Sequence, residues 1–198
     1  GRLKINTEIR TGSIVGEIDD YCATVNTYSV VMGAENAGAF ERFLFGSKTV
    51  AAAKQLDWPL IVVLPDVKFT SMRKIGLACD FRKVAETIPF KELKDLVKEF
   101  KAELHVLHVS NESGEAFSDE TVEESGWLQD IIGELKPKYH FISGDDVEKG
   151  IAEFTEKNKL DLLIVIPKKH SLFSNIFRHS YSKNLVLYSH VPVMAIHE

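Results

Sequence analysis

The residues best suited to chemistry lie together in one glycine-containing segment. Gly33 and Asn36 tolerate left-handed backbone angles, so they permit a tight loop whose N–H groups converge on an anion. Gly46 lets a second stretch of backbone approach the same anion closely. Ser47 and Thr49 follow, and their hydroxyls can donate to phosphate oxygens. These residue types indicate phosphate binding. The alternative is an ordinary glycine-rich turn between a strand and a helix.

A second segment, residues 167–180, is basic and contains no glycine. Without glycine its backbone is not expected to cradle a phosphate, although its side chains could hold an anion. A solvated basic loop is the alternative interpretation. The basic residues are Lys168, Lys169, His170, Arg178 and His179.

The rest of the chain predicts the elements that position these loops. Short β-branched apolar runs alternate with longer amphipathic stretches, which is the pattern of a parallel sheet covered by helices. The fold class is therefore α/β, a doubly wound parallel sheet with helices on both faces. Ligands of such sheets bind at the carboxyl ends of strands, where Gly33 lies. The expected strands are residues 4–10, 28–32, 60–64, 74–79, 103–109, 138–142, 160–166 and 193–197. The expected helices are residues 14–25, 40–56, 90–101, 120–135, 146–158 (capped by Asp145 or Asp146) and 174–188.

The chain also contains an internal repeat. A strand, a loop, a helix, a proline and a last strand follow one another at residues 28–63 and again at 162–196. Each proline precedes the last strand, where its missing N–H does least harm to the sheet. Only the second copy has two further strand and helix units before it. We therefore expect one full repeat plus half of another: the C-terminal half of a first repeat (1–66), a linker (67–73) and a complete second repeat (74–198).

With these motifs the chain resembles the universal stress protein family. The family pattern is Gly, two residues, Gly, nine residues, then Gly and Ser or Thr, and Gly33, Asn36 and Gly46 followed by Ser47 fall at those spacings. Asn36 replaces the second glycine. The likeness extends over essentially the entire chain. It implies a doubly wound fold with strand order 3-2-1-4-5, often dimeric or tandem, that binds ATP or a similar nucleotide in some members and none in others.

The resemblance also implies a role for Asp80, which matches the acidic residue near the adenine in the family. In the family this carboxylate works with the glycine loop of its own repeat. Asp80 belongs to the repeat that has lost the loop, whereas the half repeat that has the loop lacks the carboxylate. The expected cofactor is ATP with Mg²⁺ or none at all, and we expect no catalytic residue and no metal-binding residue. The implied nucleotide-binding residues are Gly33, Asn36, Gly46, Ser47, Thr49 and Asp80.

Other candidate residues favour structural roles. His105 and His108 are three apart on a strand, so they point to opposite faces and cannot jointly bind one metal. Cys22 and Cys79 lie on apolar faces and are interpreted as buried small hydrophobes. The acidic stretch 118–124 is interpreted as the start of a helix.

Composition excludes several classes of partner. The chain has 24 Lys and Arg against 29 Asp and Glu, a net charge of −5, so nothing electrostatic favours nucleic acid or an anionic membrane. No apolar run reaches the roughly 20 residues of a membrane helix. Two cysteines without a CxxC spacing fit a reducing cytoplasm.

Three functions stay open at this point. The first is a cytoplasmic universal stress-type module that binds a nucleotide or regulates the stress response without catalysis. The second is an ATP-binding protein with slow ATPase activity. The third is a nucleotide-free structural or dimerisation module. The expected partners are an adenine nucleotide and either a second copy, in a homo-oligomer, or the other repeat of the same chain.

The half repeat presents a physical problem. In the family's strand order 3-2-1-4-5, the first repeat here lacks its first two strands. Residues 4–10 therefore have no strand to pair with beside residues 28–32. Exposed sheet edges of this kind promote association. We expect either about 70 to 80 further N-terminal residues, judged from the size of a complete repeat, or another chain that supplies the strands. Residues 60–64 and 193–197 are expected to pair between the repeats.

Overall fold

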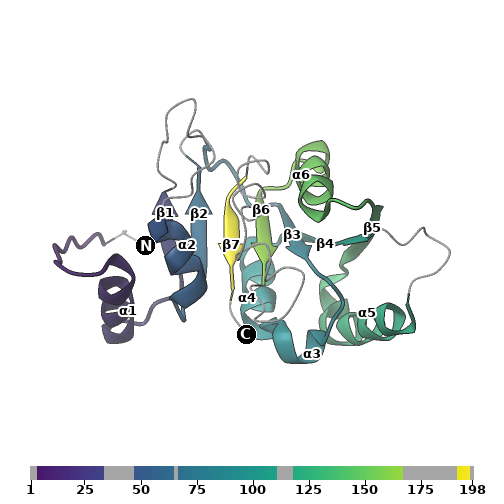
Figure 1. Ribbon diagram of the computed structural model, residues 1–198, viewed down its shortest axis with the longest axis horizontal. Helices are drawn as coiled ribbons and strands as arrows, with labels where there is room; N and C mark the ends of the chain where they lie inside the picture. The colour runs from purple at the N-terminus through teal and green to yellow at the C-terminus, as the bar shows by residue number, and fades with distance from the viewer. Residues whose placement is uncertain (1–3, 34–46, 65–66, 111–117, 167–190, 197–198) are drawn as a thin grey trace.

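The computed structural model describes residues 4–33, 47–64, 67–110, 118–166 and 191–196 (Figure 1). Within these ranges the chain forms one seven-stranded sheet in the order β1-β2-β7-β6-β3-β4-β5. The strands are β1 (Val30–Gly33), β2 (Leu60–Val63), β3 (Lys74–Ala78), β4 (Glu103–Ser110), β5 (Lys138–Ser143), β6 (Leu162–Val165) and β7 (Val193–Ala195). The helices are α1 (Ile14–Thr24), α2 (Ser47–Gln55), α3 (Val84–Thr87), α4 (Phe90–Phe100), α5 (Asp119–Ile132) and α6 (Val147–Asn158), with a 3-10 turn η1 (Gly133–Leu135).

The strands of the second repeat confirm the predicted doubly wound fold. β3 lies in the middle, with β4 and then β5 on one side and β6 and then β7 on the other. All of these neighbouring pairs are parallel. Numbered in chain order from β3, the strands therefore follow the order 3-2-1-4-5 that the family resemblance implies.

The half repeat joins this sheet through its last strand. β2 pairs antiparallel with β7, with Leu60 opposite Ala195 and Val62 opposite Val193. The predicted pairing of the closing strands is thus confirmed. β1 continues the sheet beyond β2 in parallel. Because of the one antiparallel junction, β1 and β2 run opposite to β3, β4, β5, β6 and β7.

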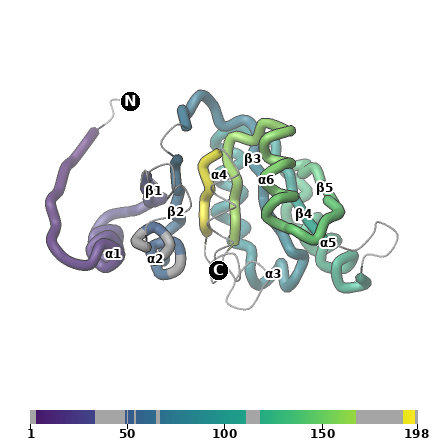
Figure 2. The backbone as a smooth tube through the Cα atoms, turned by 45° about the horizontal axis from the view of Figure 1, so that its top comes forward, coloured from purple at the N-terminus to yellow at the C-terminus, as the bar shows by residue number. Residues whose placement is uncertain are grey.

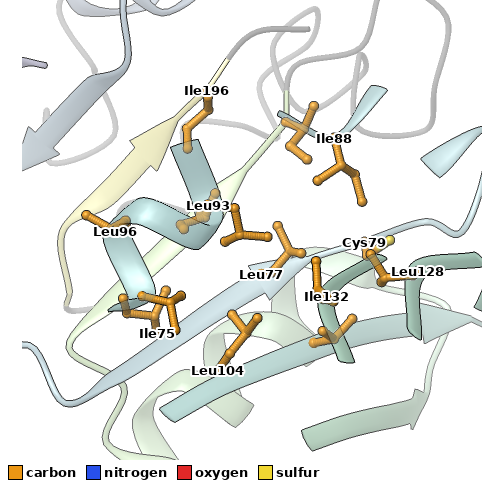
Figure 3. Close-up of a cluster of buried hydrophobic side chains, with 14 of the residues drawn as sticks. Ile75, Leu77, Cys79, Ile88, Leu93, Leu96, Leu104, Leu128, Ile132 and Ile196 are labelled. Carbon is orange, nitrogen blue, oxygen red and sulfur yellow. The ribbon is translucent and has the colours of Figure 1, made fainter. Parts of the chain in front are cut away.

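Two buried layers hold helices against the two faces of the sheet. On one face, α2 and α6 pack through Ala52 and Ile151, with Val15 and Ile18 of α1 at the margin. On the other face, α3, α4 and α5 cover the sheet. Figure 3 shows this second layer, in which Leu93 and Leu96 of α4 and Leu128 and Ile132 of α5 face Ile75, Leu77 and Leu104 of the sheet.

Side chains predicted to start helices do so. Asp146 Oδ1 accepts the N–H of Lys149 at 3.0 Å, so Asp146 caps α6. Ser118 Oγ accepts the N–H of Thr121 at 3.2 Å, which confirms that the acidic stretch 118–124 opens a helix. The carboxylates in the first turn of α5 then favour the positive end of the helix dipole.

The prediction of a strand at residues 4–10 is wrong. These residues form neither helix nor strand and run in an arc outside α1, apart from the sheet (Figure 2). The side chains of Ile5 and Ile9 are 78% and 98% exposed. The physical reason is that a strand forms only where a neighbour completes its hydrogen bonds, and no described strand lies beside this segment.

The helix predictions hold with two qualifications. Residues 40–46 of the helix expected at 40–56, and the whole helix expected at 174–188, lie outside the described residues. The short helix α3 was not predicted, because four residues are too few for a periodic apolar pattern to be recognised.

Candidate functional site

Asp80 lies just beyond the carboxyl end of β3, between the ends of β4 and β6. The chain leaves β3 towards β4 on one side, and β6 flanks β3 on the other side. This is the point where strand order reverses, and open α/β sheets bind ligands in the crevice there. Asp80 is 7% exposed, and its Oδ1 accepts the N–H of Arg82 at 3.2 Å. A fixed, nearly buried carboxylate therefore sits at the expected ligand position of the full repeat.

A tight turn after β3 holds this carboxylate in place. Phe81 and Lys83 adopt left-handed backbone angles, with φ of 48° and 50°. The Phe81 N–H points to Cys79 Sγ at 3.4 Å, and the Phe81 side chain is buried. Left-handed angles cost energy in residues with a Cβ, so the packing around Phe81 must stabilise the turn.

Aromatic side chains from β4 and β5 provide that packing. The Phe81 ring centroid lies 5.0 Å from that of His108 and 5.8 Å from that of Phe141. Tyr139 adds a third ring, 6.4 Å away. Burial, with a smaller contribution from Cys79, raises the pKa of Tyr139 to about 12, so its phenol stays protonated at neutral pH.

His108 ties the same turn to β4. Its Nδ1 lies 3.0 Å from the carbonyl oxygen of Cys79. A carbonyl can only accept, so Nδ1 carries the proton and donates it. His108 packs on the α3, α4 and α5 face, whereas His105 is directed at Phe154 of α6. The predicted opposite orientations of the two histidines are confirmed, and so is the burial of Cys22 and Cys79.

Glu124 of α5 anchors the far end of the turn. Its Oε2 accepts the N–H of Val84, the first residue of α3, at 2.7 Å. We expect Glu124→Ala to lower the free energy of unfolding by about 1 kcal/mol, because a partly buried N–H loses its acceptor. Urea denaturation measures the change. Glu123→Ala is the matched control, since Glu123 is exposed on the same helix and should change stability by less than about 0.5 kcal/mol. Equal effects of both variants would contradict the assignment.

The glycine segment lies at another place in the sheet. Gly33 is the last described residue of β1 and is exposed, and Ser47 is the first described residue of α2. Thr49 is buried in the first turn of α2. Asn36 and Gly46 lie outside the described residues, as do the five basic residues of the segment 167–180.

The structure does not bring Asp80 and Gly33 together. β2, β7 and β6 separate their strands, a distance of about 19 Å across four strand spacings. Since β1 runs antiparallel to β3, the carboxyl ends of the two strands also lie at opposite ends of the sheet, measured along the strand direction. The predicted nucleotide-binding residues are therefore divided between two places within one copy of the chain.

Within the described parts of the chain, no group of three or more His, Cys, Asp or Glu side chains could hold a metal ion. The same residues contain no helix that is long and apolar enough to span a membrane.

Comparisons with known proteins agree with this architecture. A universal stress protein from Archaeoglobus fulgidus superposes with a TM-score of 0.66 at 24% identity, over 93% of this chain and 65% of its own. A protein of unknown function from Pseudomonas aeruginosa superposes with a TM-score of 0.69 at 12% identity, over 94% of this chain and 69% of its own. This chain thus spans less than two thirds of the length of the Archaeoglobus protein.

The sequence comparison gives the family. No protein of curated function matches the chain significantly. The sequence model of the Universal stress protein family matches residues 72–197, which is more than half of the chain. The chain therefore belongs to the universal stress protein family.

Proposed function

We propose that this protein is a cytoplasmic, non-catalytic nucleotide-binding or regulatory module of the stress response, and that it binds the phosphates of an adenine nucleotide between β1 and α2. The phosphate-binding residues in this proposal are Gly33, Asn36, Gly46, Ser47 and Thr49. Asp80 follows β3, at the opposite end of the sheet from the carboxyl end of β1, and in this proposal it does not bind these phosphates.

The observation that carries the proposal is the environment of Gly33. Its backbone is not in the left-handed region, so its conformation does not require glycine. A Cβ built there would meet no described atom within 4 Å, so packing against the described residues does not require glycine either. Close approach of a ligand to the backbone is one physical reason for glycine at a strand end, and it is consistent with this open environment.

The place of α2 supports the same position. The described part of the helix runs from Ser47 to Gln55. Thr49 is buried there, and the segment that precedes Ser47 lies outside the described residues. The strand end at Gly33 and the described part of α2 therefore flank the segment whose glycine spacing matches the family.

Isothermal titration of the intact chain with ATP tests the proposal. We expect saturable binding in the presence of Mg²⁺, because the metal neutralises phosphate charge, and weaker binding when EDTA removes it. Absence of binding by a protein that circular dichroism shows to be folded would contradict the proposal. Prolonged incubation with ATP, followed by chromatography for ADP, distinguishes a binding module from the alternative of a slow ATPase.

The division of the predicted residues favours one further candidate, a nucleotide-free structural module. Asp80 and Gly33 lie at opposite ends of the strands of the sheet, so neither end has both the carboxylate and the glycine segment. In this alternative the half repeat serves to pair with the full repeat through the antiparallel β2–β7 junction, and ATP does not bind at any concentration at which the protein is folded.

A further inference from the structure

A chain of polar contacts lies on the α6 face of the sheet, at the amino ends of β4 and β5. Lys138 Nζ lies 2.6 Å from Glu103 Oε2. Glu103 Oε1 lies 2.6 Å from His105 Nε2. His105 Nδ1 in turn lies 2.9 Å from His140 Nε2. These polar contacts link β4 to β5, which is the edge strand of the sheet (Figure 1).

The two histidines lie between the sheet and α6, with His105 buried and His140 half-buried. His105 is 5% exposed, and the planes of the two rings lie within 11° of each other. Phe154 of α6 covers the pair, with its ring centroid 4.5 Å from that of His140. The pair is thus held in one orientation by apolar packing.

The charged groups around the pair come from each neighbouring element. Glu103 and Lys138 belong to the pair's own strands. From β3, Lys74 is in register with Glu103 and donates to the carbonyl oxygen of Asn158. On α6, Glu148 is the buried charged residue, but it precedes Phe154 by six residues, about 9 Å along the helix. The other charged side chains of α6 are exposed.

The chemistry of the contacts fixes the direction of each hydrogen bond when both rings are neutral. The hydrogen bond from Lys138 is the main cause that lowers the pKa of Glu103, so the carboxylate is ionised and can only accept. His105 Nε2 must therefore carry a proton. The other nitrogen of His105, Nδ1, is then an acceptor, and His140 Nε2 must donate to it.

The hydrogen bond between the two histidines can be kept when the pair takes up one proton, but not when it takes up two. With one proton, either ring can be the cation, because the proton between Nδ1 of His105 and Nε2 of His140 can belong to either nitrogen. With two protons, both facing nitrogens carry hydrogen, and two cationic donors would meet at 2.9 Å. That arrangement must open.

We propose that the His105–His140 pair is an acid-sensitive clamp that fastens the edge strand β5 to β4. The clamp is closed when both rings are neutral or when one ring is protonated. It opens when both rings are protonated. The clamp lies away from Asp80 and from Gly33, so it does not depend on the nucleotide proposal. Its expected consequence is that acid loosens β5 before the remainder of the sheet.

The sign of the pH effect follows from His140. Burial, and then His105 and Lys138, lower the pKa of His140, against an opposing effect of Glu103. The unfolded chain therefore binds more protons at His140 than the folded chain does. Stability is fully present above the ordinary histidine pKa of about 6.5 and is lost as the pH falls below it.

His140→Gln is the test variant, because its amide can donate to His105 Nδ1 or accept from it and so permits protonation of His105. Urea denaturation from pH 7 to pH 5 compares it with the wild type. We expect the unfolding equilibrium constant of the wild type to rise, relative to the variant, by up to about tenfold per pH unit below pH 6, the effect of one proton. Tyr139→Phe is the control on the same strand, and it should keep the wild-type slope.

Hydrogen exchange and NMR give a readout that does not depend on the variant folding. Protection factors of β5 amides in the wild type should fall in acid before those of β3. The ring resonances of His105 and His140 should report uptake of one proton while β5 remains protected, and of the second as protection is lost. Equal pH slopes in wild type and His140→Gln, or two full ring titrations with β5 still protected, would overturn the proposal.

Discussion

Gly46→Asp is expected to weaken the binding of Mg²⁺ and ATP by more than about 100-fold, which corresponds to about 2.8 kcal/mol. The substitution places a side chain and a negative charge where the backbone is proposed to approach the phosphates. Like charges in a partly desolvated site repel strongly, and the added atoms also prevent close approach. Isothermal titration measures the dissociation constants of the wild type and the variant under identical salt and Mg²⁺ concentrations.

Asp80→Asn is the matched control for this prediction. It removes one negative charge with almost no change in shape, at the opposite edge of the sheet from Gly33. We expect the dissociation constant for ATP to change by less than about threefold, because a charge at least about 19 Å away is largely screened by salt. Loss of binding in Asp80→Asn together with normal binding in Gly46→Asp would place the nucleotide at the full repeat and contradict the proposed position.

The sheet could be predicted from the sequence because its strands are short apolar runs between longer amphipathic stretches. The runs that became β3, β4 and β6 are buried on both faces, which gives nearly continuous apolar sequence. The repeat in the sequence also located the closing strands, which pair with each other as β2 and β7. Residues 4–10 show the limit of this reasoning, because an apolar pattern says nothing about whether a neighbouring strand is present.

The local chemistry was harder to predict. The turn at Phe81 depends on left-handed angles in residues other than glycine, for which the sequence has no signal. The contact between His105 and His140 depends on the register of β4 with β5. One signal was available: both histidines are the third residue of their strands, counted from Glu103 and Lys138. The structure offsets the two strands by two residues, with His105 opposite Lys138 and His140 opposite Leu107, and an even offset keeps both histidines on the same face.

The division of the proposed ligand residues could be foreseen only in part. The sequence showed that the glycine segment and Asp80 belong to different repeats. That they lie at opposite edges follows from the antiparallel junction, which reverses the half repeat relative to the full one. Whether β2 and β7 pair parallel or antiparallel is decided by the three-dimensional structure. A comparison of the repeats along the sequence therefore does not reveal where the carboxyl ends of β1 and β3 lie relative to each other.

Leu77→Ala is expected to lower the free energy of unfolding by about 2–5 kcal/mol. Leu77 is fully buried in β3, in register with Val106 of β4 and Ile164 of β6. Its side chain faces the layer formed by α4 and α5, so truncation leaves a cavity that rigid neighbours on three sides cannot fill (Figure 3). Urea denaturation followed by circular dichroism measures the loss.

Ile9→Ala is the matched control, because it removes an aliphatic side chain of similar size at a position that is 98% exposed. Without buried contacts to lose, it should change the free energy of unfolding by less than about 0.5 kcal/mol. A loss comparable with that of Leu77→Ala would mean that residues 4–10 pack against a neighbour in solution, as the sequence pattern first indicated. A small effect in both variants would instead contradict the central position of β3 in the core, since no buried leucine at the middle of a sheet can be truncated without a cavity or collapse of the surrounding side chains.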